Sequence, residues 1–404
     1  MPEVSSRGLA LPASPIRKLA PCADAAQARG VKVFHLNIGQ PDLETPKIMR
    51  DRLQSIDPVI AYSPSAGTPQ YLAALSGYYR SVGLEVETRN LVATTGGSEA
   101  LLFAFLCLAE AGDEVIVAEP FYTNYNSFAA MTGVKLVAVQ CRGEEGFHLP
   151  AREAFEAVLT RRTRLVLLSN PNNPTGTVYS REEIQRVFDF CKDHDLFLVS
   201  DEVYREFVYD GLAAPSALDL EGGHDRVVVA DSLSKRFSAC GIRLGCFVSR
   251  NVEVIAAVTR AAQGRLSPPA LAQILALGMS EIGPDYYASV RAEYQKRRDL
   301  IFEELSRLDG VFLRKPEGAF YVLARLPVKD SDDFARFLLE DFSFEGGTVM
   351  IAPAAGFYVT PGLGANEARM AYVLNCDDLR RSIRILGEGL KAYRERGPAV
   401  RAGN

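Results

Sequence analysis

The chain has 404 residues with a formal net charge of −5, and 48% of its residues are hydrophobic and 24% charged. The slight acidity gives no electrostatic reason to expect a nucleic-acid partner or an anionic membrane, and no apolar run approaches membrane-spanning length. Seven scattered cysteines without a C-x-x-C pair, and no visible secretory signal, indicate a protein of the reducing cytoplasm.

Seven short apolar runs alternate with longer mixed segments between residues 91 and 250, and each run is predicted to be a strand. Several are continuous Val, Leu and Ile, which is typical of strands covered on both faces. The helical segment 180–193 begins with a capping box formed by Ser180 and Glu183. This alternation predicts an α/β fold, with a seven-stranded, mostly parallel sheet flanked by helices. The runs are 91–94, 114–118, 135–139, 165–168, 196–200, 227–230 and 245–249.

The pattern changes after Pro268-Pro269. A long charged helix is predicted at 284–308, followed by a strand at 318–323, a helix at 331–340, a strand at 370–374 and a helix at 379–394. These elements predict a smaller α+β domain, with which the N-terminal segment packs. At this length two domains are expected. We therefore divide the chain into an N-terminal segment, a large domain and a small domain, at 1–44, 45–285 and 286–404.

Lys235 follows the apolar run 227–230 and lies among serine hydroxyls in the stretch DSLSKRF (231–237). Burial disfavours the charged form of a lysine, and a neutral amine is what a Schiff-base lysine needs. Arg243 follows eight residues later, and a guanidinium beside hydroxyl groups suits a phosphate monoester. A reactive lysine next to a phosphate clamp indicates pyridoxal 5′-phosphate (PLP) as the cofactor.

Two further motifs follow predicted strands. Gly97 and Ser98 come after 91–94 and open a helix, whose N-terminal amides favour an anion. The alternative is an ordinary strand-to-helix turn capped by Ser98. Tyr122 follows 114–118 and suits stacking on a planar cofactor, with a core aromatic as the alternative.

Polar side chains also follow the next two strands. Asn173 lies in NPNNPTG (170–176), at the strand end where open α/β sheets bind ligands. Asp201 lies in SDEVY (200–204), and a carboxylate there suits a protonated pyridine nitrogen. Tyr204, three residues later, suits the ring hydroxyl of the cofactor. The alternative for Asp201 is a helix N-cap.

In this order and spacing, NPNNPTG, SDEVY and SLSK-x5-GIRLG resemble the class I and II aminotransferases, which are fold type I PLP enzymes, over nearly the whole chain. The resemblance implies that Lys235 forms the Schiff base with PLP and moves the substrate proton. It implies that Asp201 pairs with the pyridine nitrogen and that Asn173 and Tyr204 bond the ring oxygen. Tyr122 is then the stacking aromatic. The residues implied for the phosphate are Gly97, Ser98, Ser232 and Arg243.

The resemblance implies three further positions. Tyr62 matches a tyrosine that reaches the phosphate of the neighbouring subunit, so a homodimer with shared active sites is expected. Arg369 matches the arginine that binds the substrate α-carboxylate, although from the residues alone it is equally well a surface charge before a strand. Gly39 matches the flexible N-terminal strand that closes over the substrate.

We therefore expect a PLP-dependent aminotransferase that moves an amino group between an L-amino acid and a 2-oxo acid, with glutamate and 2-oxoglutarate as one pair. One alternative is a C–S β-lyase or another lyase or synthase on the same fold, since the motifs do not choose among the three bonds at Cα. A non-catalytic PLP-binding regulator is a remote alternative, because the roughly 40 residues before the family match leave no room for a DNA-binding module.

Arg265 is a candidate for binding an acidic side chain of the substrate. No metal site is expected, because the four histidines lack metal-ligand spacing.

Overall fold

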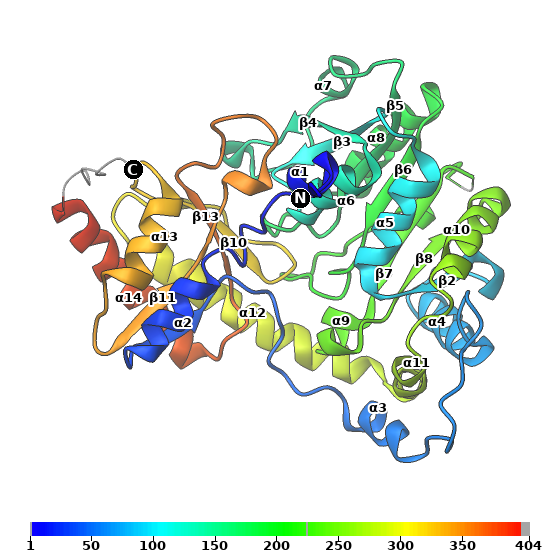
Figure 1. Cartoon of the computed structure of the whole chain (residues 1–404), viewed down its shortest axis with the longest axis horizontal. Coiled ribbons are helices and arrows are strands. Elements are labelled where there is room, and N and C mark those ends of the chain that lie inside the picture. Colours follow the sequence, from blue (N-terminus) through cyan, green and yellow to red (C-terminus); the bar gives the residue numbers. More distant parts are fainter. Residues whose placement is uncertain (1, 224, 397–404) are drawn as a thin grey trace.

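The structure is a computed structural model that describes residues 2–223 and 225–396. Residue 1 of the predicted N-terminal segment and residues 397–404 of the predicted small domain lie outside the described residues, as does residue 224. The strands form a seven-stranded sheet, a four-stranded sheet and a two-stranded sheet (Figure 1).

All seven predicted strands are present in the large sheet, so the predicted α/β fold is confirmed. Their order is β2-β8-β7-β6-β5-β3-β4, and β8 alone runs antiparallel to its neighbours. Six of these strands are buried on both faces along most of their length, as in β7, where all six residues are buried, whereas the edge strand β4 is mostly half-buried. The strands are β2 Leu91–Thr94, β3 Glu114–Glu119, β4 Lys135–Gln140, β5 Thr163–Ser169, β6 Phe197–Asp201, β7 Val227–Ser232 and β8 Gly245–Ser249.

Helices cover both faces of this sheet because alternate strand residues point to opposite sides. Leu198 packs in the core cluster with α4 (Pro69–Ser81), α7 (Arg152–Glu156), α8 (Arg181–Asp193) and α11 (Ala270–Ala276). Its neighbour Val199 packs in the opposite cluster with α5 (Gly96–Leu108), α6 (Asn124–Thr132) and α10 (Val252–Gly264). The capping box predicted for Ser180 and Glu183 is confirmed at the start of α8.

The remaining strands lie beside the long helix α12 (Pro284–Ser306) (Figure 1). The antiparallel sheet has the order β12 (Ala352–Pro353), β13 (Glu367–Ala371), β10 (Tyr321–Arg325) and β9 (Phe312–Leu313). The strand predicted at 318–323 begins three residues before β10, and the strand predicted at 370–374 begins three residues after the start of β13. Apolar burial continues into the adjoining loops, at Phe320 and Tyr372, so periodicity alone places the strand ends wrongly. The helices here are α13 Ser331–Glu340 and α14 Cys376–Glu395.

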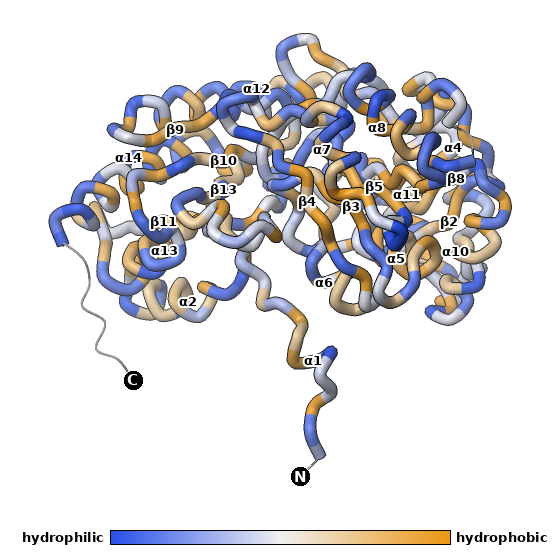
Figure 2. Tube along the Cα trace, turned by 90° about the horizontal axis from the view of Figure 1, so that it is seen from above, coloured by the Kyte–Doolittle hydropathy of each residue, from blue (hydrophilic) through white to orange (hydrophobic). Residues whose placement is uncertain are grey.

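The N-terminal segment contributes to this smaller part of the fold. Strand β1 (Lys32–His35) pairs in parallel with β11 (Gly347–Met350), and α2 (Ala20–Ala28) packs against α13. Helix α1 (Ser6–Ala10) has no buried residue and projects from the body of the molecule (Figure 2). The other short helices are α3 Lys47–Asp51 and α9 Leu233–Arg236. The predicted boundaries at 44 and 285 stay a prediction.

The hydropathy of the chain follows this architecture. In Figure 2 the strands β3, β4 and β5 are mostly hydrophobic, whereas the helices around them alternate between hydrophobic and hydrophilic residues. No helix among residues 2–223 and 225–396 is both long and apolar enough to cross a membrane.

Candidate active site

A cavity of about 500 Å³ lies where the large sheet meets the smaller part of the fold. It is lined by residues that follow strands β2, β3, β5, β6 and β7, as expected for the ligand site of an open α/β sheet. Most residues proposed from the sequence line this one cavity. They are Gly39, Gly97, Ser98, Tyr122, Asn173, Asp201, Tyr204, Ser232, Lys235, Arg243 and Arg369.

Lys235 lies in α9, the single turn of helix that follows β7. Ser232 begins this turn and caps it, because its hydroxyl accepts from the Ser234 amide at 3.1 Å. The Lys235 Nζ donates to the Gly39 carbonyl at 2.6 Å and lies 3.6 Å from the Cys240 Sγ. The amine therefore points into the cavity, towards the chain that follows β1.

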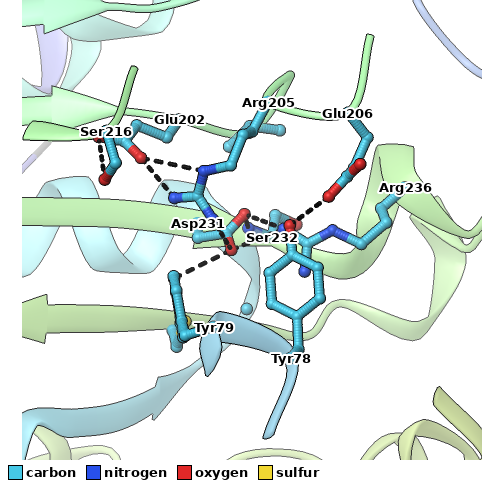
Figure 3. A network of polar contacts seen from close by, with 12 residues as sticks. Tyr78, Tyr79, Glu202, Arg205, Glu206, Ser216, Asp231, Ser232 and Arg236 are labelled. Atoms are coloured by element: carbon cyan, nitrogen blue, oxygen red, sulfur yellow. Dashed lines mark hydrogen bonds and ion pairs between the residues drawn. The ribbon is translucent and has the colours of Figure 1, made fainter. Parts of the chain in front are cut away.

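A buried ion pair closes the turn that carries Lys235 (Figure 3). The Nη2 of Arg236 donates to both carboxylate oxygens of Asp231, at 2.8 and 2.7 Å. Tyr79 also donates to this carboxylate, at 3.0 Å, and the Arg236 guanidinium lies 3.7 Å from the centre of the Tyr78 ring. Burial raises the pKa of Asp231, but Arg236 and Arg205 outweigh it and hold the pKa below its ordinary value.

Asp201 is the last residue of β6, and its side chain is buried. Tyr125 donates to its Oδ2 at 2.8 Å, and the Val203 amide donates to its Oδ1 at 3.4 Å. Burial raises the pKa of Asp201 to about 6, although both hydrogen bonds oppose this change. The alternative of a helix N-cap is wrong, because residues 203–206 form a turn and not a helix. The carboxylate is thus buried at the cavity without a cationic partner among the described residues.

Another part of the cavity suits an anion. Helix α5 begins at Gly96, so Ser98 lies in its first turn and is not its cap. Gly96 has a φ of +74°, and a Cβ there would lie 2.7 Å from the Arg243 Nη2. The Arg243 guanidinium therefore packs against the N-terminus of α5, and its Nη1 donates to the Cys240 carbonyl at 3.0 Å. Amides, serine hydroxyls and a guanidinium together suit a phosphate.

Aromatic side chains form one wall of the cavity. The hydroxyls of Tyr204 and Tyr321 are hydrogen-bonded at 2.7 Å, and both rings are buried. Tyr122 lies edge-on to Tyr125, with ring centres 5.6 Å apart. Burial raises the pKa of Tyr122 to about 12, so its phenol is neutral at physiological pH.

Arg369 lies inside β13 and is only 1% exposed, so the surface-charge interpretation is wrong. Its Nη1 donates to the Asn173 Oδ1 at 3.0 Å, and its Nη2 donates to the Asn37 carbonyl at 2.5 Å. The guanidinium lies 4.3 Å from the centre of the Tyr321 ring. Its buried Nε has no hydrogen-bond partner, and no carboxylate among the described residues forms an ion pair with it. A buried arginine in this state suits a carboxylate ligand.

Gly39 lies in the loop after β1 and not in a strand. A Cβ at this position would lie 1.8 Å from the Tyr321 hydroxyl oxygen, so only glycine allows the loop to approach the aromatic wall. This approach brings the Gly39 carbonyl to Lys235.

Tyr62 and Arg265 do not line the cavity of Lys235. They line a separate hollow, in which the Tyr62 side chain is 81% exposed. The Nη2 of Arg265 donates to the carbonyls of Ser65 and Ala93, both at 3.1 Å, and its Nη1 lies 3.5 Å from Glu99.

The sequence reasoning missed four residues of the site. Tyr125 lies in the first turn of α6, whereas Tyr122 precedes that helix, so no helical spacing in the sequence linked the two. Tyr321 and Asn37 belong to segments whose motifs were recognised, but their contacts depend on tertiary packing. Arg17 lines the cavity from the N-terminal segment, and no sequence signal pointed to it.

Comparison with known proteins gives consistent results. The model of the family described as aminotransferase class I and II matches residues 31–372. A protein of Thermus aquaticus named probable aspartate/prephenate aminotransferase is 31% identical over 373 residues, which cover 90% of this chain and 93% of that protein. Aromatic-amino-acid aminotransferase 2 of Thermococcus litoralis is 27% identical, with 94% and 96% covered. The solved structure of an alanine aminotransferase from Pyrococcus furiosus is 26% identical, has a TM-score of 0.87 and covers 96% of this chain and 100% of its own.

Proposed function

Because the chain belongs to the class I and II aminotransferase family and is a transaminase, we propose that its cavity binds PLP and that Lys235 forms the covalent bond to this cofactor. The reaction moves an amino group from an L-amino acid to a 2-oxo acid. The observation that carries the proposal is the shared cavity, which brings an amine, a buried carboxylate and a buried, unpaired guanidinium together.

The residues present fit PLP at both of its ends. The first turn of α5, Ser232 and Arg243 suit the phosphate, and Asp201 suits the protonated ring nitrogen. An ionised carboxylate is favourable there because the pyridinium replaces the water that burial removes. When bound, PLP supplies an aldehyde carbon for the amino group and a ring that withdraws electrons from the substrate Cα.

Asn173 and Tyr204 complete the contacts to the ring. The Asn173 Oδ1 accepts from Arg369, which leaves its amide nitrogen to donate to the ring oxygen. Tyr204 and Tyr321 share one hydrogen bond, so one of the two hydroxyl protons is left for the same oxygen. Tyr122 would lie against the ring face.

Arg369 binds and orients the substrate through its α-carboxylate. Because the guanidinium is buried and already held by Asn173 and Asn37, little side-chain freedom is lost on binding. Once the substrate amino group has displaced it from the cofactor, the Lys235 amine would take the proton from the substrate Cα and return it at C4′, which is general acid–base catalysis by one positioned group. The loop at Gly39 helps to exclude water from this transfer.

The names of the relatives differ in the substrate: aspartate and prephenate, aromatic amino acids, and alanine. Glutamate and 2-oxoglutarate as one substrate pair is our proposal for this chain. A homodimer is also proposed, and the exposed Val59, Ile60 and Tyr62 beside Arg265 support it as a surface that a second subunit would cover. The seven free cysteines support a cytoplasmic location.

The first experiment is the absorption spectrum of the purified protein with PLP, before and after single amino acids are added without a 2-oxo acid. The yellow absorption of the bound cofactor should bleach to that of the pyridoxamine form, and the amino acid that bleaches it fastest is the preferred donor. Release of pyruvate with ammonia or sulfide, with the yellow absorption unchanged, would contradict transamination and indicate a lyase.

The Lys235→Ala variant separates the covalent role of Lys235 from the binding of the cofactor. We expect turnover to be abolished while PLP still binds through its phosphate, as measured by equilibrium dialysis. Wild-type turnover in this variant would refute the assignment of Lys235.

A further inference from the structure

Arg17 lines the cavity of Lys235 from the N-terminal segment, between α1 and α2. This segment crosses between the large sheet and the smaller part of the fold (Figure 1). Arg17 is exposed at the mouth of the cavity, and its guanidinium has no hydrogen bond or ion pair within the described part of the chain. It is thus a cation that faces the site without a protein partner.

The contacts that hold Arg369 also hold the turn that carries Arg17. The side chain of Asn37 donates to the Ile16 carbonyl at 2.7 Å, while its own carbonyl accepts from Arg369 at 2.5 Å. On the other side, Pro15 packs against Gly356, where a Cβ would lie 2.8 Å from the Pro15 Cγ. The position of Arg17 is therefore coupled to that of the arginine proposed for the α-carboxylate.

More cations than carboxylates line the cavity among the described residues. Four cations line it, Arg17, Lys235, Arg243 and Arg369, against the single carboxylate of Asp201. In the proposed function Lys235 bonds to the cofactor, Arg243 binds its phosphate and Arg369 binds the α-carboxylate. Arg17 is the cation that remains.

Arg17 also lies close to the aromatic wall. Burial raises the pKa of the Tyr122 phenol, and the charge of Arg17 is among the groups that lower it again. Tyr122 and Arg17 line the same cavity as Arg369, so Arg17 is available to a substrate whose α-carboxylate lies on Arg369.

We propose that Arg17 binds a second carboxylate on the substrate, so that this enzyme prefers dicarboxylic amino acids such as aspartate and glutamate. This inference rests on the proposed function, because it requires the α-carboxylate to lie on Arg369. Arg265 is less suited to this role within the same chain, because Ser65, Ala93 and Glu99 already hold its guanidinium. The specificity then comes from the N-terminal segment of the subunit that holds the substrate.

The test compares Arg17→Ala, Arg17→Lys and wild type in the half-reaction with one amino acid, followed by the absorption of the bound cofactor. The ratio of kcat/KM for aspartate to that for alanine should fall at least tenfold in Arg17→Ala, since a charge-assisted hydrogen bond is lost. Arg17→Lys should recover part of this ratio. The matched control is Lys18→Ala, which removes the neighbouring cation; Lys18 pairs with Asp332 outside the cavity, so the ratio should stay unchanged.

A binding measurement on the PLP-loaded protein gives an independent readout. Succinate, with two carboxylates, should bind more tightly than butyrate by calorimetry in wild type, and this difference should vanish in Arg17→Ala. An unchanged aspartate-to-alanine ratio and an unchanged succinate preference would overturn the role of Arg17. Loss of both preferences in Arg265→Ala with none in Arg17→Ala would move the site to Arg265. If no amino acid bleaches the wild-type absorption, the proposed function itself fails.

Discussion

Replacing Arg236 by methionine tests whether the buried ion pair holds the turn that carries Lys235. Arg236 is buried, and its Nη2 donates to both oxygens of the Asp231 carboxylate (Figure 3). Methionine keeps much of the apolar contact with the Tyr78 ring but removes the charge. Asp231 then keeps the Tyr79 hydroxyl and the Ser232 amide, with Arg205 3.9 Å away, so it is left buried and only partly compensated.

Breaking a buried ion pair on one side costs about 3–5 kcal/mol, and the remaining partners of Asp231 favour the lower end, about 3 kcal/mol. With an unfolding entropy of roughly 2.1 cal/mol/K per residue, 404 residues give about 0.85 kcal/mol/K. The Tm of Arg236→Met should therefore lie ~3.5 °C below that of wild type. Replacement of the exposed Arg307, paired with Glu303, by methionine is the matched control, and it should cost at most about 0.5 kcal/mol.

The pH dependence of this difference has a definite sign. In folded wild type the pKa of Asp231 is below its ordinary value. The ionised Asp231 therefore stabilises the fold at any pH above the pKa that Asp231 has in the unfolded chain. This stabilisation is lost as pH falls through the pKa that Asp231 has in the folded protein. Without Arg236 burial raises that pKa, so Asp231 takes up a proton as pH falls and part of the penalty disappears. The difference in Tm should therefore be largest near pH 7 and shrink towards pH 4.

Differential scanning calorimetry on Arg236→Met, Asp231→Asn and the double variant measures the coupling of the pair. Each single variant leaves one charge of the pair buried without its partner, whereas the double variant removes both charges of the pair. The double variant should therefore regain at least half of the fall in Tm that Arg236→Met causes. A fall of less than about 1 °C in Arg236→Met, or a double variant less stable than both singles, would refute the reasoning.

Two further predictions concern the cavity. Tyr125→Phe removes the phenol that donates to Asp201, whose pKa is already raised to about 6 by burial. When PLP affinity is titrated against pH, it should be lost as pH falls through the pKa of Asp201. In Tyr125→Phe this loss should begin about one pH unit higher than in wild type. Superimposable pH profiles of the two proteins would contradict the role of Tyr125. Gly39→Ala forces a Cβ against the Tyr321 hydroxyl, so kcat/KM should fall about tenfold or more in steady-state assays. Gly77→Ala, where nothing lies within 4 Å, should leave kcat/KM unchanged, and equal values for both variants would count against the close approach.

The sequence by itself determined the architecture of the large sheet and the strand ends that meet at the cavity. Strands buried on both faces require continuous apolar runs, and this signal is local, so the six buried strands were found, and the half-buried edge strand β4 was found from the apolar run 135–139. Gly97, Asn173, Asp201 and Lys235 each follow such a run, and the carboxyl ends of parallel strands meet at one edge.

Only the tertiary structure decided which charges are buried and what holds them. Arg369 lies in a strand whose end the apolar pattern misplaced, and its burial depends on Asn37, Asn173 and Tyr321, which lie far from it in the sequence. Tyr125 and Arg17 reach the cavity for the same reason. A strand follows from the period of its own residues, whereas a buried cation is defined by partners that the fold brings from other segments, and no local pattern contains them.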